Sequence, residues 1–396
     1  MYTVVLVRQR RQGGIGLGPS GNGITMSTVN IYERTVDHFL APILSFLRDS
    51  AVSEIMVNSH DEIYVERGGR LERTEARFED ADSLMSAVNN VLQFTGKRLT
   101  NENPLVDSRL PDGSRVHVIL PPLSRRGVCM TIRKFAKVNF SAQHLLELGA
   151  WTPQVMEYIK TCVLAEKNIL VTGGTSSGKT SLLNVLSGFI PAHQRIVTIE
   201  DSSELELQQD HVISLETRQP DRWGRGAVGI SQLFRGSLRL RPDRIIIGEV
   251  RGGEALDVIQ AMTSGHAGSM STLHANMALD ALNRLETMAM MNKVELPLHA
   301  LRSQIASAID VIVQVTRFTD GRRALTQVSE VLPLGEDGRY RLQDMFVYKL
   351  LEGQAGRLGV GKLAHTGARS SFRDEPKVRV LRDSWGLTQT IFLADD

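Results

Sequence analysis

The chain of 396 residues has two cysteines, few aromatic side chains and almost no net charge, and each shortage excludes a class of protein. Cys129 and Cys162 are too few for a disulfide scaffold or a four-cysteine zinc module, and so few cysteines are typical of a reducing compartment. Aromatic residues make up 5% and the net charge is +2, so we expect no direct partner among nucleic acids. No apolar run approaches the roughly 20 residues of a membrane-spanning helix. The composition predicts a soluble cytoplasmic protein and leaves room for docking on a membrane complex.

The order of the patterns predicts several domains. Residues 1–30 are rich in glycine, which is costly to order, and are predicted to be a flexible tail. Residues 31–138 combine apolar residues at helical spacing with hairpin signals at Gly68-Gly69 and Asp112-Gly113, which predicts a small α+β domain. Residues 139–151 are interpreted as a linker.

From residue 152 to about residue 334, strand-like runs alternate with helical patterns. This alternation predicts an α/β domain whose sheet has a parallel core with helices on both faces. In such a sheet a phosphate ligand binds at the carboxyl ends of the strands. Residues 335–396 contain one β-like stretch at 340–347 and are predicted to be an appendage.

A phosphate-binding motif lies near the start of this second domain. Its residues read G-x-x-x-x-G-K-T: Gly173, Gly174, Thr175, Ser176, Ser177, Gly178, Lys179 and Thr180. An apolar run precedes the motif and a helical pattern begins at Ser181, which is the strand, loop and helix context that a P-loop requires. Backbone N–H groups of the loop and of the helix N-terminus, including that of Ser181, would hold phosphate oxygens of the nucleotide. Lys179 would reach the β- and γ-phosphates of ATP, and the Thr180 hydroxyl would hold Mg²⁺.

Two acidic side chains downstream of the loop are candidates for the chemistry of hydrolysis. Glu200 ends the apolar run 196–199, and Glu249 follows the run 245–248. A carboxylate at such a strand end can orient the attacking water or help to hold Mg²⁺. We favour Glu200 for the water and Glu249 for Mg²⁺, although the sequence does not divide the two duties. Capping of the next turn is the structural alternative for Glu200.

Histidines and arginines add further candidates. His266 and His274 flank the run 269–273, where one of them could sense the γ-phosphate or relay a proton; a structural role is the alternative for each. Arg115 and Arg133 stand on predicted strands of the first domain, and guanidinium groups there could stabilise charge on the γ-phosphate. Ordinary surface arginines are the alternative.

Taken in order, these stretches resemble the type II/type IV secretion ATPases, which are hexameric traffic ATPases. The motif 173–180, Thr198-Ile199-Glu200-Asp201, the run 247–255 and the stretch from Gly265-His266 to His274 are similar to that family's Walker A, Asp, Walker B and His boxes. The residues 104–115, 131–135 and 239–243 most resemble the CpaF-like ATPases of Tad (Flp) pili. The cysteine motif of type II secretion and type IVa pilus extension ATPases is missing, which argues against those branches.

The resemblance implies a RecA-like ATPase domain behind an α+β N-terminal domain, with ATP between the two and Arg115 and Arg133 acting on it. It also implies a homo-hexamer at the cytoplasmic face of the inner membrane, where hydrolysis acts on platform proteins and so on pilins or secreted substrates. A conjugation or type IV secretion ATPase of the same fold is the nearest alternative. A RecA-like nucleic-acid motor and an ATP-binding assembly module with little turnover are more distant ones.

Overall fold

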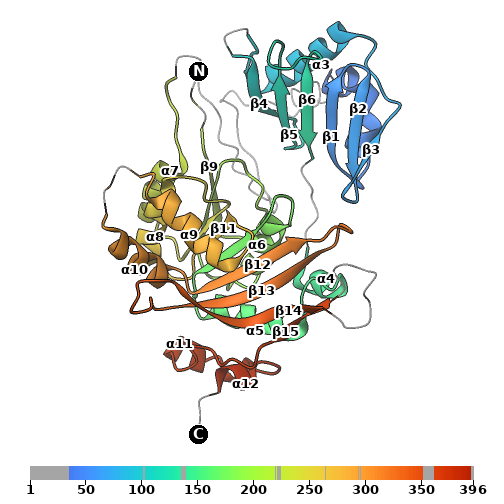
Figure 1. Cartoon of the computed structure of the whole chain (residues 1–396). Coiled ribbons are helices and arrows are strands. Elements are labelled where there is room, and N and C mark those ends of the chain that lie inside the picture. Colours follow the sequence, from blue (N-terminus) through green and yellow to red (C-terminus); the bar gives the residue numbers. More distant parts are fainter. Residues whose placement is uncertain are drawn as a thin grey trace, which may run out of the picture. The chain divides into compact units, whose positions relative to one another are not determined.

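The computed structural model divides the chain into two compact units, Met1–Ala136 and Lys137–Asp396, each with its own hydrophobic core (Figure 1). It describes residues 35–100, 103–134, 140–218, 220, 224–263, 265–292, 294, 296–350 and 361–393. The predicted tail of residues 1–30 lies outside these ranges. None of the described helices is long and apolar enough to cross a membrane.

The N-terminal unit is built on a six-stranded antiparallel sheet in the order β3-β2-β1-β6-β5-β4. Alternate residues of β1 point into the core, as the sequence pattern requires of a sheet with one covered face. Asp80 begins the helix α3 with a capping box that it shares with Ser83. The elements of the unit are η1 (Ala41–Ile43), α2 (Leu44–Arg48), β1 (Val52–Ser59), β2 (Glu62–Arg67), β3 (Arg70–Arg73), α3 (Ala81–Phe94), β4 (Leu105–Arg109), β5 (Arg115–Ile119) and β6 (Cys129–Arg133).

The C-terminal unit is built on a nine-stranded sheet in the order β15-β14-β13-β12-β7-β11-β10-β8-β9. The six strands from β12 to β9 are parallel, and β13, β14 and β15 continue the sheet in antiparallel fashion. The strands are β7 (Ile169–Gly173), β8 (Ile196–Glu200), β9 (Val212–Glu216), β10 (Arg244–Ile247), β11 (Met270–His274), β12 (Val311–Arg317), β13 (Arg323–Leu332), β14 (Arg341–Leu350) and β15 (Gly361–His365).

Helices cover both faces of this sheet. The helices are α4 (Ala142–Glu147), α5 (Pro153–Leu164), α6 (Lys179–Ser187), α7 (Ile230–Ser237), η2 (Leu238–Leu240), α8 (Glu254–Thr263), α9 (Ala278–Ala289), α10 (Leu298–Ala308), α11 (Pro376–Arg379), η3 (Arg382–Ser384) and α12 (Gln389–Phe392). One core includes α5, α6 and the C-terminal segment, and the other includes α7 to α10. All residues of β7, β8 and β10 are buried, which is typical of parallel strands covered on both faces. The predicted α/β class with a parallel core is therefore confirmed.

The described residues beyond 335, which are 336–350 and 361–393, are part of this unit, whereas the sequence predicted an appendage. β14 and β15 extend the sheet, and α12 packs on α5, where the rings of Phe392 and Tyr158 stack at 5.6 Å. Glu157 of α5 also accepts hydrogen bonds from the backbone N–H and the hydroxyl of Thr388. The predicted linker likewise contains α4, whose Ala142 carbonyl accepts a bond from the indole of Trp151. Both segments are fixed by contacts with distant residues, which a local pattern does not record.

Candidate active site

The parallel strands of the C-terminal unit bring the candidate residues of this domain to one edge of the sheet. The register pairs His274 at the end of β11 with Gly173 at the end of β7, and Glu200 ends β8. Glu249 follows β10 by two residues. Carboxyl ends of parallel strands meet at the same edge, so the glycine loop, two acids and one histidine lie there together.

The glycine loop joins β7 to α6. Gly178 is the N-cap of α6 with a φ of 96°, a left-handed conformation that favours glycine. Lys179, the first residue of α6, is buried, and its Nζ donates to the Gly174 carbonyl at 2.9 Å. The loop thus presents the N-terminus of a helix of nine residues and a lysine folded back over it. This arrangement provides N–H donors and a positive charge for an anion.

Glu200 lies buried beside the loop, with 3% of its surface exposed. One carboxylate oxygen, Oε1, accepts from the backbone N–H groups of Glu204 and Leu205 at 2.9 and 3.0 Å. Burial raises the pKa of Glu200 to about 7, although these two hydrogen bonds act in the opposite direction. A Cβ on Gly248 would meet Glu200 Cγ at 2.9 Å, so the glycine before Glu249 makes room for this carboxyl group.

Glu249 is held between two basic side chains. Its Oε1 lies 2.9 Å from His274 Nε2, and its Oε2 accepts from Arg251 Nε at 2.8 Å. Burial and the Lys179 ammonium lower the pKa of His274, and the charge of Glu249 acts in the opposite direction. Lys179 Nζ lies 3.3 Å from Nε2 and 3.4 Å from Nδ1 of the same ring. The side chains of Lys179, His274 and Glu249 therefore contact one another in series, from the glycine loop to the acid.

Oxygen ligands for a cation are present at the start of α6. Thr180 Oγ1 donates to Glu204 Oε2 at 3.2 Å. No group of three or more acidic, histidine or cysteine side chains that could hold a metal occurs within the described residues. Mg²⁺ does not need such a group, because it is commonly held by one or two carboxylates together with substrate phosphates and water. Thr180 with Glu204 fits that pattern. Glu249 lies at the same edge of the sheet, where it contacts His274.

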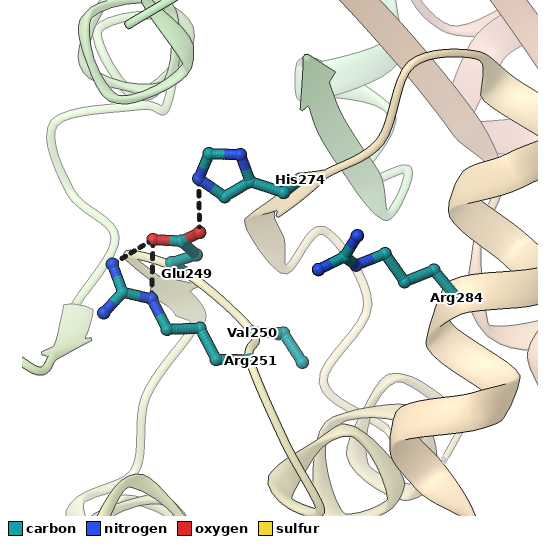
Figure 2. A pocket seen from close by; sticks show the side chains of 5 residues that line it. All are labelled: Glu249, Val250, Arg251, His274 and Arg284. Atoms are coloured by element: carbon teal, nitrogen blue, oxygen red, sulfur yellow. Dashed lines mark hydrogen bonds and ion pairs between the residues drawn. The ribbon is translucent and has the colours of Figure 1, made fainter. Parts of the chain in front are cut away.

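A cavity of about 290 Å³ opens next to the contacting side chains of His274 and Glu249. It is lined by Glu249, Val250, Arg251, His274 and Arg284, and Arg284 comes from helix α9. Figure 2 shows Glu249 between His274 and Arg251 on one side and Arg284 reaching in from the other. The site thus continues from the glycine loop into an open space with charged walls.

The other candidates come from other parts of the chain. His266 precedes β11 and therefore stands at the amino end of that strand, the end opposite to His274, so the two histidines do not share a site. Arg115 and Arg133 lie in the N-terminal unit, where the register of β5 and β6 pairs them directly. Directly paired residues point to the same face of a sheet, so these two side chains leave the sheet on the same face.

Three residues at this edge of the sheet were not predicted from the sequence. Glu204 follows Glu200 by four residues in an acidic stretch, which was a visible signal, but its contact with Thr180 depends on the turn after β8. Arg323 of β13 donates to the Ser176 carbonyl at 2.9 Å, and Arg284 lines the cavity. Both arginines come from elements with no motif, so only the fold shows them.

Comparison with known proteins finds relatives that match most of the chain. The family model "Type II/IV secretion system protein" matches residues 37–349. The type IV secretion system protein PtlH of Bordetella pertussis is 36% identical over 314 residues, covering 72% of this chain and 91% of PtlH. The type IV secretion system protein VirB11 of Bartonella quintana is 30% identical over 325 residues, covering 73% and 91%. The crystal structure of the pilus retraction motor PilT with bound ADP has a TM-score of 0.55 at 20% identity, covering 76% of this chain and 84% of that one, and supports the fold alone.

Proposed function

The chain belongs to the superfamily of type II/type IV secretion ATPases, and from this premise we propose that it hydrolyses Mg²⁺-bound ATP at the carboxyl edge of its nine-stranded sheet to drive a pilus or secretion machine. The observation that carries the proposal is the convergence of Lys179, Glu200 and the Glu249–His274 pair on that edge. A structural ion-pair network would not need a glycine loop at the N-terminus of a helix beside it.

The chain's own groups account for binding and for proton transfer. The N–H groups of the loop and of the first turn of α6 would hold the phosphates, with Lys179 exchanging the Gly174 carbonyl for a phosphate oxygen. Thr180 and Glu249 would hold Mg²⁺, and Glu204 would add a second carboxylate. When bound, Mg²⁺ supplies positive charge against the charge that develops on the transferred phosphoryl group. Glu200, with a pKa of about 7, is suited to orient a water and to accept its proton.

The remaining parts of the proposal concern assembly. We propose a homo-hexamer at the cytoplasmic face of the inner membrane that acts on platform proteins, in which Arg115 and Arg133 stabilise charge on the phosphoryl group. Their pairing on β5 and β6 supports a joint role. A structural role for both is contradicted if Arg133→Ala lowers kcat more than it weakens ATP binding while the ring still forms.

Two versions of this function, pilus assembly and type IV secretion, differ in what the machine transports. The residues that resemble CpaF-like proteins favour assembly of a Tad-type pilus, whereas the names of PtlH and VirB11 favour type IV secretion. Deletion of the gene and complementation with the wild type or with Glu249→Gln would test both, with surface pili and export of proteins or DNA as the two measurements. Loss of pili alone supports the pilus version, and loss of export alone contradicts it.

The enzymatic claim is tested with the purified full-length protein. Wild type should release phosphate from ATP only with Mg²⁺. Glu249→Gln should bind ATP but lose about 100-fold or more in kcat, because it removes a charge that acts on the reacting centre. Equal turnover by the wild type and this variant would contradict the role of Glu249, and no turnover by the wild type under any condition would contradict the proposal.

A further inference from the structure

Arg284 is a basic residue of the cavity for which the motifs provide no role. It lies in the middle of α9, whose buried face is made by other residues: Ala278, Ala281, Leu282, Leu285, Met288 and Ala289. Arg284 itself is solvent-exposed on the side of the helix that borders the cavity. Among the described parts of the chain, no hydrogen bond or ion pair joins it to another residue. Packing and pairing therefore do not explain why an arginine stands here.

The cavity has more positive than negative charge on its walls. Its lining contains two guanidinium groups, of Arg251 and Arg284, against the single carboxylate of Glu249. That carboxylate is already engaged by Arg251 and His274. Figure 2 shows the Arg284 guanidinium directed into the space between these groups and its own helix. Arginine in an open, electropositive cavity is the usual donor for a phosphate group, which it can bind through two N–H groups at once.

The cavity also adjoins the glycine loop. His274 lines it, and the ring of His274 lies 3.3 to 3.4 Å from Lys179 Nζ. A volume of about 290 Å³ is far larger than the roughly 30 Å³ that one water occupies in the liquid, so a tetrahedral oxyanion can enter. The cavity therefore lies within one side chain, His274, of Lys179, in reach of a phosphate group that is bound at, or departs from, the loop.

We propose that this cavity is a binding site for a phosphate group and that Arg284 is the side chain that holds it. The inference rests on the proposed ATPase function only for the source of the phosphate. That source is either the terminal phosphate of bound ATP or the inorganic phosphate that hydrolysis releases. In both cases Arg284 touches the reacting or departing group, and it links α9 to the state of the nucleotide.

The test compares the full-length wild type with Arg284→Gln, Arg284→Lys and a matched control. Arg379→Gln is the control, because it also removes one exposed arginine of the same unit but lies on α11, away from the cavity lining. Direct binding of radiolabelled inorganic phosphate is measured without nucleotide by equilibrium dialysis. A charge-assisted bond to phosphate predicts roughly tenfold weaker binding in Arg284→Gln, partial recovery in Arg284→Lys and no change in Arg379→Gln.

Nucleotide affinities then identify the source. If the cavity holds the terminal phosphate, Arg284→Gln weakens a non-hydrolysable ATP analogue by a similar factor and leaves ADP unchanged. If it holds released phosphate, both nucleotides bind as in the wild type, and inhibition of turnover by added phosphate becomes roughly tenfold weaker.

Unchanged phosphate binding, analogue affinity and phosphate inhibition in Arg284→Gln would overturn the inference, whatever the turnover. Conversely, a wild type that binds phosphate through Arg284 but hydrolyses no ATP would contradict the proposed function and leave the phosphate site in place. The two claims therefore fail separately.

Discussion

The two ends of the parallel strands in the C-terminal unit both gather buried charges, yet they differ in how those charges are paired. At the amino ends, the buried Arg244 donates to the carbonyls of Gly268 and Val163 and to Gln194 Oε1, at 2.8 to 3.2 Å. Lys167 likewise pairs with Asp310 and Glu375. At the carboxyl ends, Glu200 keeps a raised pKa and the cavity is open.

The difference shows that buried charge alone does not identify a functional site. Burial also raises the pKa of Asp310 at the amino ends, but Lys167 and the backbone N–H of Asn168 oppose that shift within a closed network. Charges of a closed network stabilise the fold, whereas charges beside a glycine loop and a cavity can exchange their partners for a ligand. Changes at the amino ends should therefore alter stability alone, and changes at the carboxyl ends should alter turnover, with or without a change in stability.

The largest effect is expected from Arg244→Met. Arg244 is 1% exposed, and its removal leaves buried acceptors without donors, so the C-terminal unit should lose about 3 to 5 kcal/mol of stability. Denaturant unfolding measures this loss, and ADP affinity at low temperature should stay as in the wild type. A variant that unfolds at the wild-type midpoint but no longer binds ADP would reverse the assignment of the two ends.

Lys179→Ala should have the opposite profile. Loss of the ammonium group removes a donor to the phosphates, so turnover should fall roughly 100- to 1,000-fold. Its ammonium group contacts the Gly174 carbonyl and His274, neither of which belongs to a hydrophobic core, so the midpoint of unfolding should change little. Phosphate release and unfolding are measured on one preparation. Wild-type turnover would exclude the phosphate role.

Glu200→Gln tests the raised pKa as a dependence of stability on pH. Unfolded glutamate titrates near 4.5 and folded Glu200 near 7, so the folded protein binds more protons between these values and loses stability as the pH rises through them. The amide oxygen of glutamine can accept the same two N–H groups without a charge. The variant should therefore gain stability relative to the wild type from pH 4.5 to 7, by up to about 3 kcal/mol. A constant difference across this range would show that the carboxyl group is not buried as described.

The smallest effect is expected from Lys377→Gln. Lys377 pairs with Glu166 at the rim of the amino-end network, with 57% of its side chain exposed. Surface pairs of this kind contribute at most about 1 kcal/mol, because water and salt screen them. Unfolding with and without added salt measures this contribution. A loss as large as that in Arg244→Met would mean that the network extends to the surface.

The sequence predicted the parts of the site that depend on local pattern. The strand, glycine loop and helix around Lys179 and the strand ends at Glu200 and Glu249 follow from short stretches, and the rule for parallel sheets brings them to one edge. Arg284 and Arg323 could not be predicted, because their neighbours come from strands and helices far along the chain. His266 illustrates the reverse case, since a strand of five residues places two nearby histidines at opposite ends.

The segment beyond residue 335 could not be predicted for a similar reason. Phe392 is buried, yet it lies in a helix of only four residues whose place is set by the distant helix α5. β15 is a short strand at the edge of the sheet, and its pairing with β14 holds it there. Short elements with few apolar residues depend on tertiary contacts more than on propensity.

The most direct test of the central claim is an image reconstruction of the full-length particle with Mg²⁺ and a non-hydrolysable ATP analogue. We predict a triphosphate against the loop from Gly173 to Thr180, with Lys179 Nζ moved from the Gly174 carbonyl to a phosphate oxygen. A nucleotide bound elsewhere, or none while Lys179 keeps its carbonyl partner at saturating analogue, would contradict it.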